Sequence, residues 1–234
     1  AQETFTARYT HETVALAFSI TEEAIEDNLY DRLASRYTKA LARSMANTKQ
    51  VKAVAPLING LPTNDAFDSG DGVSLFNTAH PTISGTVKNT LTTQADLNET
   101  SLEQSLIDIA AMTDERGLKI AARGVKMIVP SELQFTAERL MKSQGRTATA
   151  DNDINAIVSM GMVPQGYRVN NFLTDPDAFY IITDVPNGMK YFERAAIKTA
   201  MEGDFDTGNV RYKARERYSF GVSDYRGIFG VEGA

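Results

Sequence analysis

The feature that most constrains the fold is a helical pattern starting at Thr21, which neither proline nor glycine interrupts before Pro56. A helix of about 35 residues is ~50 Å long, and few domains of this size contain one. Ser19 and Thr21 are both candidate N-caps, and Glu22 completes an S-x-x-E capping box with Ser19. We therefore expect one long helix that ends before Pro56.

Apolar residues recur at every fourth position of this helix and drift by ~40° per step, so the stripe winds around the helix and meets different neighbours at its two ends. These residues are Ile25, Leu29, Leu33, Tyr37, Leu41 and Met45. The first turns of the helix are acidic and the later turns are basic, and both signs suit the helix dipole. The acidic residues are Glu22, Glu23, Glu26, Asp27 and Asp31.

The segment from Thr4 to Ile20 is predicted to be extended, because apolar side chains alternate along it. Phe5 and Tyr9 have odd numbers whereas Phe18 has an even one, so a bulge or bend is expected between them. An extended arm of roughly 50 Å needs a partner strand. We expect this partner to lie upstream of Ala1, in a longer gene product.

Composition excludes several classes of protein. With 42% apolar and 23% charged residues, the chain can form one sizeable domain or two small ones, and general disorder is excluded. The absence of cysteine excludes disulfides, thiolate nucleophiles and cysteine-based metal sites. The apolar runs are far shorter than the ~20 residues that cross a bilayer. The net charge of −6 argues against a sequence-specific nucleic-acid binder.

After the long helix, helices and strands follow one another without regular βαβ alternation, which favours an α+β fold. Residues 56–98 are predicted to form loops and short strands, and residues 145–153 a mobile loop. Two shorter helices are expected, one with a capping box at residues 100–103 and one opened by Pro130-Ser131, with Gln134 at the box position. Strands are expected at 118–129, 167–172, 178–184, 195–201, 210–220 and 227–231.

Candidate catalytic and metal-binding residues are few. His11 and His80 are the only histidines and no serine lies in a G-x-S-x-G motif, so we interpret both histidines as structural. Gly70 and Gly72 lack the third glycine and the lysine of phosphate-binding loops. Residues 204–209 match a calcium loop poorly and are interpreted as a hairpin turn. The sequence therefore predicts no catalytic residue, no cofactor and no metal ion.

Four segments, in order along nearly the whole chain, resemble the major capsid protein of tailed bacteriophages. They are ITEEAIEDNLYDRLASRYTKALARSMANTKQ, LFNTAHPT, GLKIAARGVKMIVPSELQFTAERLMKS and ARERYSFGVSDYRGIFG. The resemblance implies that residues 1–20 are the returning strand of an extended loop and that 21–130 are the spine helix and peripheral domain. It further implies that 131–205 form an axial domain and that 206–234 return to the peripheral domain as C-terminal strands. The family's N-terminal arm and outgoing loop strand have no counterpart here and are expected upstream.

The strand at 210–220 carries four cations at alternate positions, and therefore on one face. These are Arg211, Lys213, Arg215 and Arg217. The other face is aromatic or small, apart from Glu216. Three interpretations of the basic face stay open: a solvated face, pairing with carboxylates of a neighbouring subunit, and contact with packaged DNA. We favour pairing between subunits over DNA because the total charge is acidic.

The resemblance implies a structural protein rather than an enzyme, assembling in the host cytoplasm into hexamers and pentamers of an icosahedral virion head around double-stranded DNA. It also implies scaffolding, portal and decoration proteins as partners, DNA bound without sequence specificity, and no membrane. The alternatives are an encapsulin-type nanocompartment shell, which holds cargo enzymes, and a soluble enzyme with a carboxylate pair. The candidate inter-subunit contacts are the four cations together with Glu22, Glu23, Glu26, Asp27, Phe5 and Tyr9.

Overall fold

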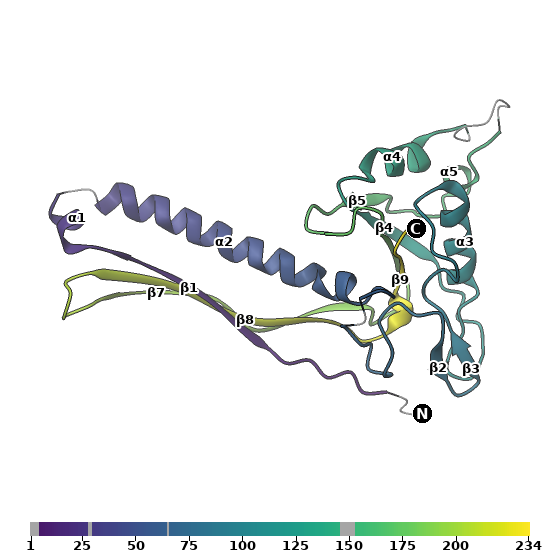
Figure 1. Cartoon of the computed structure of the whole chain (residues 1–234), viewed down its shortest axis with the longest axis horizontal. Helices are drawn as coiled ribbons and strands as arrows, with labels where there is room; N and C mark the ends of the chain where they lie inside the picture. Colours follow the sequence, from purple (N-terminus) through teal and green to yellow (C-terminus); the bar gives the residue numbers. More distant parts are fainter. Residues whose placement is uncertain (1–4, 28–29, 65, 146–152) are drawn as a thin grey trace. The chain divides into compact units, whose positions relative to one another are not determined.

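The computed structural model describes residues 5–27, 30–64, 66–145 and 153–234 (Figure 1). Contacts divide the chain into two units. The core unit comprises the residues up to Arg8, Val54–Lys190 and Gly221–Ala234, and the helix–sheet unit comprises Tyr9–Ala53 and Tyr191–Phe220. These divisions differ from the predicted domain boundaries at 130 and 205, and the assignment of peripheral and axial domains stays a prediction. The mixed order of helices and strands confirms the α+β class.

The helix–sheet unit contains a three-stranded sheet of order β1-β8-β7. Its strands are β1 (Glu12–Ile20), β7 (Met189–Gly203) and β8 (Val210–Val222), of which β7 and β8 each extend a little way into the core unit. β1 is antiparallel to β8, from Glu12 opposite Tyr218 to Ile20 opposite Val210. The sequence predicted a partner strand for β1 upstream of Ala1. For the edge of β1 that faces β8 this prediction is wrong, because β8 supplies the backbone hydrogen bonds there.

A long helix is present as predicted, but it does not start at Thr21. A short helix α1 (Glu22–Glu26) ends at its C-cap Asp27, and α2 (Tyr30–Asn59) follows. Thr21 caps α1 by accepting a hydrogen bond from the Ala24 amide, whereas Ser19 belongs to β1 and forms no capping box.

Within α2, Pro56 does not end the helix, which continues for a further turn to Asn59. Pro56 removes one backbone hydrogen bond, but the turn that follows it buries Leu57, which is 1% exposed. Burying a leucine side chain contributes about 1.5–3 kcal/mol and offsets much of that loss. The helix ends before Gly60, where a Cβ atom would lie only 2.5 Å from Cβ of Leu75.

The core unit is built on a four-stranded sheet of order β5-β4-β6-β9, in which only the β4 and β5 pair is parallel. Its strands lie within the predicted segments and are shorter: β4 (Gly124–Val129), β5 (Tyr167–Val169), β6 (Phe179–Thr183) and β9 (Ile228–Val231). The loop-rich region that follows α2 contains the hairpin of β2 (His80–Thr82) and β3 (Gly85–Val87), as predicted. A single 3-10 turn, η1 (Tyr225–Gly227), connects β8 to β9.

The helices of the core unit are α3 (Glu99–Ala110), α4 (Gln134–Lys142) and α5 (Ala156–Ser159). Both predicted capping boxes need correction. The box of α3 joins Asn98 and Ser101, since Asn98 accepts from the Ser101 amide at 2.8 Å. At α4 no side chain caps the helix, because the helix begins at Gln134 and its N-cap position is occupied by Leu133 rather than Ser131.

Two other predictions from the sequence concern a loop and membrane spans. Residues 146–152 of the predicted mobile loop lie outside the described residues. Within the parts of the chain that the structure describes, no helix is long and apolar enough to cross a membrane.

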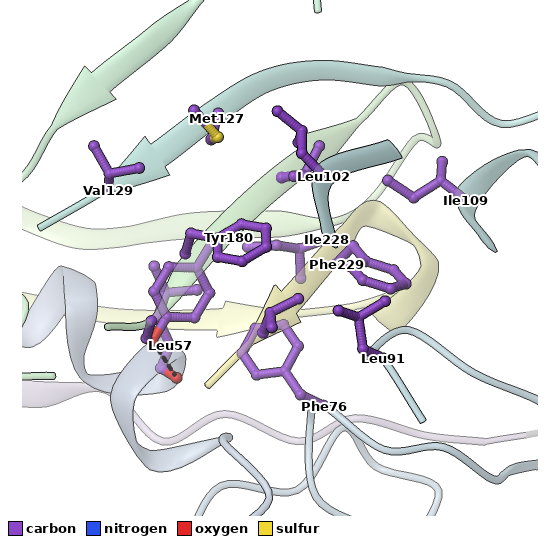
Figure 2. Close-up of a cluster of buried hydrophobic side chains, with 14 of the residues drawn as sticks. Leu57, Phe76, Leu91, Leu102, Ile109, Met127, Val129, Tyr180, Ile228 and Phe229 are labelled. Carbon is purple, nitrogen blue, oxygen red and sulfur yellow. Dashed lines mark hydrogen bonds between the residues drawn. The ribbon is translucent and has the colours of Figure 1, made fainter. Parts of the chain in front are cut away.

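Figure 2 shows the apolar cluster at the centre of the core unit, where side chains from helix, loops and sheet meet. Leu57 of α2 and Phe76 of the loop region lie beside Tyr180 of β6 and Phe229 of β9, and all four are nearly or fully buried. The Tyr180 hydroxyl donates to the Leu57 carbonyl at 3.4 Å. This burial fixes the last turn of α2 in the core unit.

A buried polar network beside this cluster holds the loop region to the strands. The Asn89 amide donates to the carbonyls of Leu75 at 2.7 Å and Tyr225 at 3.1 Å, and its oxygen accepts from His80 Nε2 at 3.0 Å. His80 also contacts Asp71 at 2.6 Å and stacks on the ring of Tyr225 at 3.8 Å. His80 is fully buried within this packing, as a structural histidine is.

We predict that Asn89→Ala lowers the free energy of unfolding by about 3 kcal/mol, because it removes several buried hydrogen bonds and leaves carbonyl groups without donors. Asn64→Ala is the control, since the hydrogen bonds of Asn64 are exposed, and it should cost less than ~1 kcal/mol. Urea unfolding of the unassembled subunit measures both. Equal losses in the two variants would contradict the structural role given to Asn89.

Candidate inter-subunit surface

The sheet of the helix–sheet unit presents one basic face, which is formed by alternate residues of β8. The side chains of Arg211, Lys213, Arg215 and Arg217 are all exposed, as the alternation predicts. The β1 residues opposite them are small and uncharged: Ser19, Ala17, Ala15 and Thr13. Because cross-strand neighbours are the closest side chains on a sheet face, β1 supplies no acid to neutralise these cations.

The opposite face of β8 packs against α2. Leu41 and Met45 of the predicted helix stripe are 7% and 3% exposed and contact Ala214, which is fully buried. Phe18 of β1 joins this cluster and stacks on Tyr212 at 5.0 Å between ring centroids. The sheet is therefore apolar toward the helix and basic on the other side.

The one acid on this face of β8, Glu216, forms an ion pair with Lys49 of α2 at 2.5 Å. The Glu216 side chain is 3% exposed and that of Lys49 is 35% exposed. The hydrogen bond that the Lys49 ammonium donates to Glu216 raises the pKa of Lys49, and the ammonium group also lies 5.1 Å from the centre of the Tyr218 ring. A buried carboxylate is thus compensated by both charge and hydrogen bonding.

The acids at the start of the helical region are exposed: Glu22, Glu23, Glu26 and Asp27. Glu22 lies against Gly208, in the turn between β7 and β8, where a Cβ atom would clash with its carboxylate. Arg211 forms an ion pair with Asp204 of the same turn. For Lys213, Arg215 and Arg217, by contrast, no ion pair is found among the described residues.

The two aromatic candidates near the N-terminus differ in their surroundings. Phe5 is 42% exposed, and neither it nor Tyr9 lies in a strand. Tyr9 stacks on Phe192 of its own chain at 5.5 Å between ring centroids. Phe5 is therefore the more available of the two for contact with another subunit.

A sequence-family comparison identifies the kind of protein that carries this surface. The family described as phage capsid protein matches residues 3–231. The chain belongs to this phage capsid protein family. None of the curated proteins compared with the chain matches it in sequence.

Solved structures agree in fold with this capsid protein. The capsid of Myoviridae phage XM1 is similar at 10% identity and a TM-score of 0.58, over 96% of this chain and 74% of that one. A structure of Mycobacterium phage Che8 is similar at 17% identity and a TM-score of 0.53, over 95% and 72%. The SrpI encapsulin of Synechococcus elongatus PCC 7942 is similar at 10% identity and a TM-score of 0.55, over 96% and 74%.

Sequence reasoning about this capsid protein found the basic face but missed the partner of Glu216. The signal was present, because Lys49 follows Leu41 and Met45 at the same spacing of four and so extends the buried stripe of α2. No signal of comparable strength pointed to Asp204 as the partner of Arg211. Within the described residues, no group of three or more acidic or histidine side chains is placed to hold a metal ion.

We predict that Lys49→Met lowers the free energy of unfolding at pH 7 by about 2 kcal/mol, because it leaves the Glu216 carboxylate buried without a partner. The matched control is Lys52→Met, whose partner Glu12 is 61% exposed and whose loss should cost about 0–1 kcal/mol. Denaturant unfolding of the subunit measures both. Equal losses would contradict the importance of the buried pair.

The pH dependence of this pair has a definite sign. The pKa of Lys49 in the folded chain is raised above the unfolded value of 10.5, so the stability that it adds is fully present below pH 10.5. That contribution is lost as the pH rises through the folded pKa. The difference in stability between wild type and Lys49→Met should therefore shrink at high pH, and a constant difference up to pH 12 would be inconsistent with this assignment.

Proposed function

We propose that the protein is a major capsid protein that assembles into the hexamers and pentamers of an icosahedral phage head enclosing double-stranded DNA. The family match over residues 3–231 is the observation that carries this proposal. The fold similarity to the XM1 capsid supports it. On this proposal the chain is a structural protein that performs no bond chemistry.

The basic face of β8 is the surface that we assign to contact between subunits. Lys213, Arg215 and Arg217 are exposed without an ion pair among the described residues, and like charges along one strand repel one another. A neighbouring subunit can bring carboxylates to this face, and Glu23 and Glu26 are exposed acids suited to that role. Such charge complementarity selects the correct partner more than it adds affinity.

Further partners follow from the proposed role. Assembly in the host cytoplasm would involve scaffolding, portal and decoration proteins, and the shell would contact DNA without reading its sequence. The net charge of −6 supports weak, nonspecific contact with DNA rather than a dedicated binding site.

An encapsulin-type shell is the second candidate, because the SrpI encapsulin is similar in fold with a TM-score of 0.55. The two functions differ in what the shell contains. Particles that hold nuclease-protected DNA support the phage head, whereas particles that hold a cargo enzyme support the nanocompartment. A monodisperse monomer that forms no particles under any assembly condition would contradict both. Negative-stain imaging of the purified protein shows whether it forms particles or stays a monomer.

We predict that Arg215→Glu lowers the yield of particles several-fold while the subunit still folds, because it places an acid opposite the acids of a neighbour. A compensating Glu23→Lys or Glu26→Lys should restore part of the yield. Lys39→Glu is the control, since Lys39 is an exposed cation of α2 outside the sheet. Sedimentation of particles at low salt measures the yield, and circular dichroism checks the fold.

Two results would refute this role for the basic face. One is normal assembly of Arg215→Glu at low salt, and the other is unfolding of the subunit by the same change. Exposed ion pairs are screened by salt, so assembly of the wild type should also be more sensitive to salt than folding of the subunit.

A further inference from the structure

The turn between β7 and β8 holds a fully exposed aromatic ring. Phe205 is 100% exposed, the highest value among the large apolar side chains of the described residues. Backbone hydrogen bonds close the turn beneath it, from the Asp204 amide to the Asn209 carbonyl at 2.8 Å and from the Gly208 amide to the Asp204 carbonyl at 2.9 Å. The ring therefore projects from a hydrogen-bonded turn, so its burial by a partner would cost little backbone conformational entropy.

A hollow of about 530 Å³ lies beside this ring, within the helix–sheet unit. Small side chains of two strands line it, Ala17 of β1 and Ala200 of β7. Residues of both charges also line it: Arg211 and Lys213 of β8, with Glu202 of β7 and Asp204 of the turn. Pockets of this size accept groups much larger than a phenyl ring.

We propose that a second copy of this chain occupies the hollow, with Phe205 of each copy inserted between the small side chains of the other. A projecting ring and a hollow that lie side by side on one surface are self-complementary, which is the condition for a twofold contact between identical chains. Arg211 and Asp204 pair with each other within the chain, which leaves Lys213 and Glu202 as one cation and one acid that a second copy can complement.

The proposal rests on the proposed function, since a shell brings many copies of the chain into contact. It goes further by naming the ring that anchors one contact and the hollow that receives it. Exposed aromatic side chains that become buried at the centre of an interface carry much of its binding energy.

The absence of cysteine from the chain permits a direct test by disulfide trapping. Phe205→Cys and Ala200→Cys subunits are mixed, assembled and oxidised, and peptide mass spectrometry identifies the linked residues. A disulfide needs Cα atoms about 4.4–6.8 Å apart, so we expect a link between residues 205 and 200 of different chains. Thr199→Cys replaces Ala200→Cys in the control, because residue 199 points to the other face of β7 and should not be linked.

A second comparison applies if the cysteine variants fail to assemble, and it uses two other substitutions of Phe205. Phe205→Ser should raise the protein concentration needed for assembly about tenfold, whereas Phe205→Leu, which keeps an apolar side chain, should stay within about twofold of the wild type. Both should leave subunit stability unchanged, because the ring has no contacts to lose. Links at 199 as frequent as at 200, or unimpaired assembly of Phe205→Ser, would overturn the inference. Failure of the wild type to form particles would instead count against the proposed function.

Discussion

Antiparallel pairing of β1 with β8 is the interaction on which the rest of the helix–sheet unit depends. It places nine residues of β1 opposite β8, and the alternation of side chains then assigns every residue of both strands to one of two faces. Small, uncharged β1 residues lie beside the cations of β8, so β1 neutralises none of them. The apolar residues of both strands meet α2 on the other side, where Leu41 and Met45 are buried.

The ion pair between Lys49 and Glu216 makes this arrangement specific. A slip of β8 by one residue would exchange its two faces and bring a cation, Arg215 or Arg217, beneath the helix and close to Lys49. Glu216 would then move to the exposed face and leave Lys49 with repulsion instead of a partner. A buried charge pair adds little net stability over an apolar pair, and we infer that its main effect here is to disfavour the wrong register. This penalty protects the basic face that we assign to assembly.

Local patterns in the sequence predicted what local forces decide. The alternation of cations in β8 gave its exposed face correctly, and the cluster of turn formers at 204–209 is the predicted hairpin turn. The errors arose where distant segments decide. The partner of β1 lies about 200 residues away in sequence, and the turn after Pro56 is helical because Leu57 is buried against strands that no local pattern reveals.

The candidate surface shows the same division between local and distant effects. Periodicity identified the cations, but their availability depends on which residues β1 places beside them, and that depends on the pairing register. Phe205 was missed because a single aromatic residue within a polar turn has no periodic pattern to mark it. Its significance comes from its full exposure beside a hollow, which only the folded chain brings together.

The basic face of β8 is the surface that we assign to contact between capsid subunits, and a high-resolution density map of assembled particles would show what lies against it. We expect carboxylates of a neighbouring chain within about 4 Å of Lys213, Arg215 or Arg217. A map in which all three side chains point into solvent, or contact only nucleic acid, would contradict it.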